Sequence, residues 1–142
     1  MLDKFENYIK IGKAKKKTPD KVEAISLIEK AEKRMKYIRL LNEDTSSLVF
    51  EDAYESAREA AQSLMSIKGY KPYSHEATIS FLKDFFTKKF TEQELREFDR
   101  YREIRNNSIY KAVNISTEDA KKCIEFSKLI IKKIKEVINE TK

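Results

Sequence analysis

Apolar side chains recur at every third or fourth position over most of the chain, which is the spacing of one face of an α-helix. The first long run extends from Val22 to Leu41. Thr18 followed by Pro19 predicts its start, because threonine caps a helix and proline fits the first turn. A second run, residues 46–68, carries alanines along one side and stops at a glycine. This stripe of small residues indicates a neighbouring helix that approaches closely.

Three further helices are predicted by their capping residues. Ser74 can cap a third helix, and Thr91 with Glu94 forms a capping box that opens a fourth. After a short break, Ser116 or Thr117 caps a fifth. The expected architecture is all-α, an up-and-down bundle of four to five helices occupying residues 18–142.

The composition excludes several other classes of protein. Two glycines and two prolines are too few for the many tight turns of a β-sandwich or barrel, and the glycines do not cluster as a phosphate-binding loop requires. A single cysteine excludes a disulfide framework and a cysteine-rich zinc site. No apolar run has the length of a membrane span, so we expect a cytoplasmic protein that does not bind membranes. No spacing of histidine and carboxylate residues recurs as in a metal site, and we expect no metal and no cofactor.

Residues 1–17 are predicted to form a basic arm or a short helix outside the bundle. A short apolar pattern beginning at Leu2 is followed by a lysine run that ends at Lys17. The segment has six lysines against two acidic residues, a local charge of +4. It could bind phosphates, but the pattern favours a solvated or frayed arm.

The fourth helix carries an unusual apolar face. At about 100° per residue, Arg102 and Arg105 fall inside the apolar stripe of this helix. Because arginine cannot lose its charge, a guanidinium on such a face needs a partner or solvent. The two arginines either pair with carboxylates or reach solvent, or they have a functional role. The apolar residues of the stripe are Leu95, Phe98, Ile109 and Val113.

Polar groups that can grip a nucleotide lie along the edge of this stripe. Arg102, Asn106 and Tyr110 are spaced four apart and form one row, with Arg105 beside it. Arginine binds phosphate through two parallel hydrogen bonds, and a tyrosine ring can stack on a base.

The segment Glu103–Tyr110 resembles the motif of the HEPN superfamily (higher eukaryotes and prokaryotes nucleotide-binding), in which an arginine, often followed by a polar residue, precedes a histidine by four to six positions. Residues 53–60, 68–70 and 74–77 are also similar to small archaeal and bacterial members. The resemblance covers about residues 18–138.

This resemblance implies a helical bundle that dimerises and places the motif residues of two protomers at a shared cleft. Many members are metal-independent endoribonucleases, often toxins, encoded beside a small nucleotidyltransferase-fold partner that neutralises them. When the family motif is mapped onto this sequence, the resemblance implies that Arg105 is the phosphate-binding arginine and Asn106 the polar residue after it. Tyr110 stands at the position of the motif histidine. Arg102 and Lys111 complete the expected nucleotide- or RNA-binding set.

Tyr110 is the main departure from the motif. Tyrosine has an ordinary pKa of about 10 and is a poor general base, whereas histidine near 6.5 exchanges protons at neutral pH. The single histidine, His75, lies outside the motif and is interpreted as a helix-start residue. On a straight helix Arg105 and Tyr110 point about 140° apart, so they face the same point only if the helix bends or if Arg105 of one chain meets Tyr110 of another across a dimer, and we favour the dimer.

Three functions stay open from the sequence. The first is a nucleotide- or RNA-binding dimer that works with a nucleotidyltransferase-type partner and has lost or changed the proton-transfer step. The second is an active endoribonuclease in which the arginines lower the pKa of Tyr110, and the third is a purely structural interaction partner. The net charge is +6, but four of the seven arginines lie between positions 96 and 105, and we expect this local cluster to bind phosphate.

Overall fold

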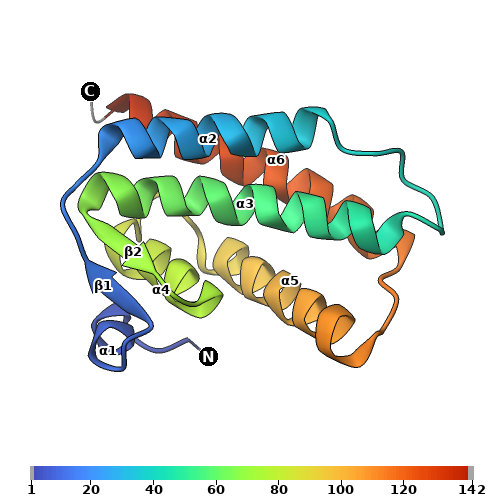
Figure 1. The fold of residues 1–142 in the computed structure, drawn as a ribbon, viewed down its shortest axis with the longest axis horizontal. Coiled ribbons are helices and arrows are strands. Elements are labelled where there is room, and N and C mark those ends of the chain that lie inside the picture. The colour runs from blue at the N-terminus through green and yellow to red at the C-terminus, as the bar shows by residue number, and fades with distance from the viewer. Residues whose placement is uncertain (1, 141–142) are drawn as a thin grey trace.

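A computed structural model describes residues 2–140. This part of the chain forms six helices and two short strands, which confirms the predicted all-α bundle (Figure 1). In chain order the elements are α1 (Phe5–Lys10), β1 (Ala14–Lys16), α2 (Lys21–Lys36), α3 (Ser46–Lys68), β2 (Tyr70–Pro72), α4 (His75–Phe85), α5 (Glu92–Lys111) and α6 (Thr117–Glu140).

Helix α3 runs through the middle of the molecule. Figure 1 shows α2 and α6 on one side of it and α4 and α5 on the other. Its alanines, including Ala53, Ala57 and Ala60, are fully buried, and its most extensive contacts are with α2 and α6. The small side chains allow this close approach, since a helix surface of alanines has no bulk to hold a neighbour away.

The predicted helix ends hold for α3 to α6 and fail for α2. The capping box of Thr91 and Glu94 forms, and Ser74 and Ser116 accept hydrogen bonds from the first turns of α4 and α6. The cap of α2, however, is Asp20 rather than Thr18, because the Asp20 side chain accepts from the backbone N–H of Glu23.

Helix α2 also ends at Lys36, earlier than its apolar pattern predicts. The amide oxygen of Asn42 accepts hydrogen bonds from the N–H groups of Asp44 and Thr45. This local turn competes with a helix, so the apolar residues Ile38, Leu40 and Leu41 lie in the connection to α3 instead.

The N-terminal segment packs against the bundle, so the expectation of a frayed arm is wrong. Phe5 is only 2% exposed, and its ring makes edge contacts with Tyr70, Phe81 and Phe85. Strand β1 pairs antiparallel with β2, which follows α3 directly. Burial of Phe5 and the strand pairing fix the backbone, although most of the lysines remain exposed.

Only the first half of α5 packs on the core. Its buried residues are Leu95, Phe98 and Tyr101, whereas Ile109 and Val113, expected on the same stripe, are about half exposed. Residues 109–114 are all exposed, so this end of the helix is open to solvent.

Candidate phosphate-binding site

The start of α4 and the second half of α5 enclose an open hollow of about 230 Å³, here called the motif hollow. Ser74 is the N-cap of α4, and the first turn of this helix faces α5. The α5 residues that line the hollow are mostly three or four positions apart, so they lie on the same side of the helix. The residues lining it are Ser74, His75, Glu76, Arg102, Arg105, Asn106 and Tyr110.

The structure therefore brings together four of the five residues that the sequence singles out. Arg102, Asn106 and Tyr110 form the row that their spacing predicts, and Arg105 lies beside them. Lys111 is exposed at the end of α5 and does not line the motif hollow.

Arg105 and Tyr110 border the same hollow within one chain, so a second chain is not needed to bring them to a shared space. The hollow is open and Tyr110 is 80% exposed at its rim. Long side chains on two sides of a helix can reach the same open space, which a projection of backbone positions does not capture.

Arg102 is neutralised by carboxylates. Its Nε lies 2.7 Å from Asp99, and its terminal nitrogens lie 3.6 Å from Glu76 on α4 and 3.7 Å from Glu103. The charge of Arg102 is thus balanced by carboxylates of the protein itself. Its ion pair with Glu76 on the neighbouring helix α4 explains why an arginine lies on the apolar stripe.

Arg105 has no such partner. Among residues 2–140 it makes no hydrogen bond and no ion pair, and its Nε is buried without an acceptor. A buried N–H group of a guanidinium that is not hydrogen-bonded costs free energy, more than for a neutral donor. Arg105 is therefore a cation in the motif hollow whose charge the described residues leave unpaired.

His75 is the residue of this site that the sequence reasoning missed. It is the first residue of α4, as expected, but it also lines the motif hollow, and its Nδ1 lies 2.9 Å from the hydroxyl of Tyr54. Burial, together with the nearby positive charges of Arg58 and Arg105, lowers the pKa of His75 to about 4. The imidazole is consequently neutral at neutral pH.

A polar group on α3 lies behind His75. Arg58 binds Glu55 through two parallel hydrogen bonds of 2.9 and 2.7 Å. Burial raises the pKa of Tyr54, so its hydroxyl stays protonated. Burial by itself would raise the pKa of Glu55, but the hydrogen bond and the charge of Arg58, together with the charge of Arg105, outweigh burial and lower this pKa. In the sequence, Tyr54 and Arg58 stand four positions apart among the alanines of this helix. This polar pair on an otherwise apolar segment is the pattern that could have indicated a polar site next to α3.

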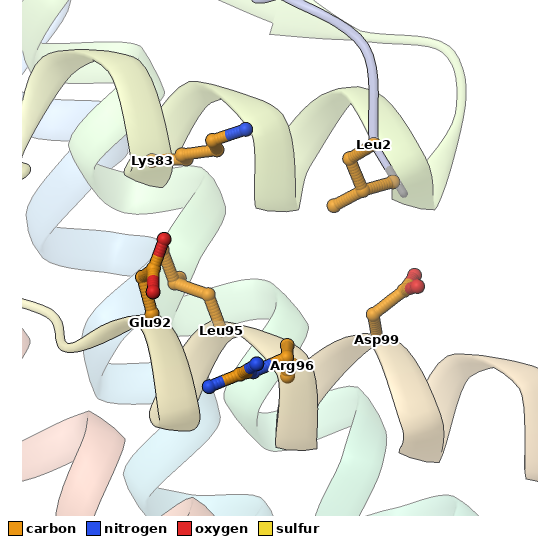
Figure 2. A pocket seen from close by; sticks show the side chains of 6 residues that line it. All are labelled: Leu2, Lys83, Glu92, Leu95, Arg96 and Asp99. Carbon is orange, nitrogen blue, oxygen red and sulfur yellow. The ribbon is translucent and has the colours of Figure 1, made fainter.

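The other arginines of the predicted cluster lie elsewhere. Arg100 pairs with Asp119 at 3.2 Å. Arg96 lines a different groove between α4 and α5, where Figure 2 shows it on the α5 side with Leu95, facing Leu2 and Lys83. The cluster at positions 96–105 is thus divided among separate partners, and only Arg102 and Arg105 reach the motif hollow.

Neither a metal-binding cluster nor a membrane-spanning helix is found in the described chain. Within residues 2–140, no group of three or more histidine, cysteine, aspartate or glutamate side chains is arranged to hold a metal ion. Over the same residues, no helix is long and apolar enough to cross a membrane.

Comparison with known protein families gives one match. A family model described as HEPN domain matches residues 24–137. The matched region contains α3, α4 and α5, and therefore the whole motif hollow. A search of curated protein sequences found no significant match.

Proposed function

Because this chain belongs to the HEPN domain family, we propose that it binds phosphate groups of a nucleotide or RNA in the motif hollow, with Arg105 as the principal contact. Membership of this family supports a nucleotide- or RNA-related function in general. The assignment of the function to particular residues is our proposal.

The unpaired state of Arg105 carries the proposal. A guanidinium keeps its charge at every accessible pH, and no carboxylate within 4.0 Å neutralises Arg105 among the described residues, so an anion that enters the open hollow meets an unpaired cation. A phosphate oxygen accepts the two parallel hydrogen bonds that arginine offers. The amide of Asn106 and the phenol of Tyr110, with Arg102 and Lys111 near them, would then contact the base or ribose.

The neutral state of His75 also supports phosphate binding in the motif hollow. The repulsion from Arg58 and Arg105 that lowers its pKa would be relieved by a bound anion. A phosphate in the hollow would therefore raise the pKa of His75, and the two events would be coupled.

A second candidate function is metal-independent RNA cleavage. It is favoured by the position of His75, the only histidine of the chain, in the same hollow as Arg105. Within the described residues, Nδ1 bonds to Tyr54 and Nε2 has no hydrogen-bond partner, so Nε2 is available to a substrate. In this mechanism His75 would transfer the proton, in place of Tyr110, while Arg105 stabilises charge on the phosphoryl oxygens.

Assembly is also part of the proposal. Ile109, Tyr110 and Val113 are exposed beside the hollow, and a second copy of the chain would cover them. A small nucleotidyltransferase-fold protein is the partner that the family resemblance implies. If the chain is only a structural partner of such a protein, Arg105 becomes an interface anchor and RNA binding is absent.

Binding is tested by titrating the protein with single-stranded RNA at several salt concentrations. We expect Arg105→Ala to weaken binding by about tenfold or more and to reduce the slope of log affinity against log salt by about one. Arg96→Ala removes the same charge from the other groove and should bind like the wild type. Equal binding by both variants and the wild type would refute the proposed site.

Cleavage is tested by incubating RNA with the protein in the presence of a metal chelator. If the protein is a nuclease of this kind, His75→Ala abolishes cleavage, and Tyr110→Phe shows whether the phenol takes part. Cleavage that survives both His75→Ala and Arg105→Ala would exclude the motif hollow as its site.

A further inference from the structure

The antiparallel strands β1 and β2 have two different faces. Ala14 is buried and Tyr70 packs on the rings of the core, so one face is turned inward. Side chains alternate along a strand, and directly paired residues share a face. Lys15 pairs with Lys71, and the N–H of Tyr73 donates to the carbonyl of Lys13. The outward face, here called the basic ribbon, thus consists of Lys13, Lys15, Lys71 and Tyr73.

The basic ribbon surrounds an exposed aromatic ring with unpaired cations. Tyr73 is 51% exposed, and the ammonium groups of Lys15 and Lys71 lie 6.0 and 5.6 Å from the centre of its ring. None of the three ribbon lysines has a carboxylate within 4.0 Å among residues 2–140, whereas the neighbouring Lys17 is paired with Glu23 at 3.0 Å. Their positive charge is therefore available to an anionic partner.

The basic ribbon is adjacent in the chain to residues that line the motif hollow. Tyr73 immediately precedes Ser74 and His75, both of which line the hollow. Consecutive Cα atoms are about 3.8 Å apart, so the exposed ring begins one residue from the hollow. Lys13 and Lys15 lie before residues 24–137, the part that the family model matches, whereas Lys71 and Tyr73 lie within it, so the family match covers only half of this surface.

An aromatic ring flanked by cations is suited to single-stranded nucleic acid. Unpaired bases stack on aromatic side chains, while lysines follow the phosphate backbone. In a duplex the bases are already stacked and paired, so the ring has nothing to bind. The aromatic ring thus favours a single strand, and the lysines account for the attraction to its backbone.

We propose that the basic ribbon is a second binding site, which holds a single-stranded RNA as it runs into the motif hollow. One base stacks on Tyr73, and Lys13, Lys15 and Lys71 contact the backbone. This inference rests on the proposed function, because it gives the ligand of the motif hollow as an RNA strand rather than a free nucleotide.

The test compares three probes: adenosine monophosphate, a single-stranded oligoadenylate of about ten nucleotides, and a duplex RNA of the same length. We expect the oligoadenylate to bind tightest. Tyr73→Ala should weaken its binding by about tenfold, Tyr73→Phe should retain it, and neither change should affect the monophosphate.

The lysines are tested together as Lys13→Gln, Lys15→Gln and Lys71→Gln in one variant. Removing three backbone contacts should reduce the salt slope for the oligoadenylate by about two, since each contact to a single strand contributes about 0.7. The matched control removes three exposed lysines from α6, which packs against α2 and α3 rather than the ribbon: Lys121→Gln, Lys128→Gln and Lys132→Gln.

The outcomes separate the two proposals. If Arg105→Ala weakens binding of the monophosphate and the oligoadenylate while the ribbon variant behaves like the α6 control, the inference is overturned and the proposed function stands. Equal affinity for duplex and single strand also overturns it. If Arg105→Ala changes neither ligand, the proposed function fails, and with it the path from ribbon to hollow.

Discussion

Two arginines near the motif hollow show how differently one residue type can be used. Arg58 is held by two hydrogen bonds to Glu55 and a third to Gln62. Arg105 has none of these contacts, and its Nε is buried without an acceptor. Removing one partner of a buried ion pair leaves an uncompensated charge and destabilises the fold. An unpaired guanidinium has no such internal partner, so its removal is not expected to destabilise the fold in this way.

Replacing each arginine by methionine, which has similar length and no charge, should separate these roles. Arg58→Met leaves the Glu55 carboxylate without its partner and should lower the free energy of unfolding by about 1–3 kcal/mol. Arg105→Met should leave it unchanged or raise it by about 1 kcal/mol, while RNA binding is lost. Urea unfolding measures both, and equal destabilisation by the two changes would give Arg105 a structural role instead.

His75 makes stability depend on pH in a defined window. Its pKa is about 4 in the folded protein, against the 6.5 of an unperturbed histidine. Between these two pH values the unfolded chain binds more protons than the folded protein. The stabilisation that comes from the neutral His75 is therefore complete above pH 6.5 and is lost as the pH falls toward 4. His75→Gln, which does not titrate, should flatten the decrease between about pH 7 and pH 5.

Urea unfolding at closely spaced pH values checks this prediction. No other side chain of ordinary pKa titrates in that range, because His75 is the only histidine. Parallel pH profiles for the wild type and His75→Gln would contradict it. The imidazole resonances in an NMR titration give the pKa directly.

At the level of elements, Gly69 connects the central helix to the basic ribbon. It ends α3 with a left-handed backbone, φ 86°, and its carbonyl accepts a hydrogen bond from the N–H of Lys17. A Cβ at this position would lie 2.7 Å from the carbonyl oxygen of Lys17 and 3.0 Å from Pro19. The glycine is therefore needed both for the left-handed conformation and for the close approach of the segment that follows β1.

The second glycine supplies a control for this requirement. Gly12 also has a positive φ, 78°, but nothing lies within 4 Å of the position of its Cβ. Gly12→Ala should therefore cost about 1 kcal/mol of stability, from the backbone alone. Gly69→Ala should cost about 3 kcal/mol, because the segment after β1 that carries Lys17 and Pro19 must also move. Equal losses in thermal unfolding would show that β1 tolerates the extra methyl group.

For the whole molecule, the open end of α5 predicts a homodimer. Ile109 is 45% exposed beside the motif hollow, and a partner would cover it together with Val113. Light scattering at micromolar concentration should give the mass of a dimer, and Ile109→Glu should give a monomer with unchanged helical content by circular dichroism. Ile11→Glu, at an isoleucine that is 66% exposed on the N-terminal segment, is the control and should stay dimeric. A monomeric wild type would contradict this prediction.

The sequence by itself determined the helices and most of their ends. Apolar period and capping depend on residues within about one turn, so the stop of α3 at Gly69 and the capping box of Thr91 and Glu94 could be predicted from neighbours in the chain. The same local spacing predicted that Arg102, Asn106 and Tyr110 form one row, because a helix fixes the positions of residues four apart.

The tertiary structure alone decided which groups meet across the chain. His75 faces Arg105 only because α4 packs beside α5, and β1 is fixed only because β2, more than fifty residues later, pairs with it. Helical spacing shows Arg102 and Arg105 as equivalent, yet Glu76 on another helix helps to neutralise one and leaves the other free. Such contacts depend on packing between distant segments, which no local pattern of residues contains.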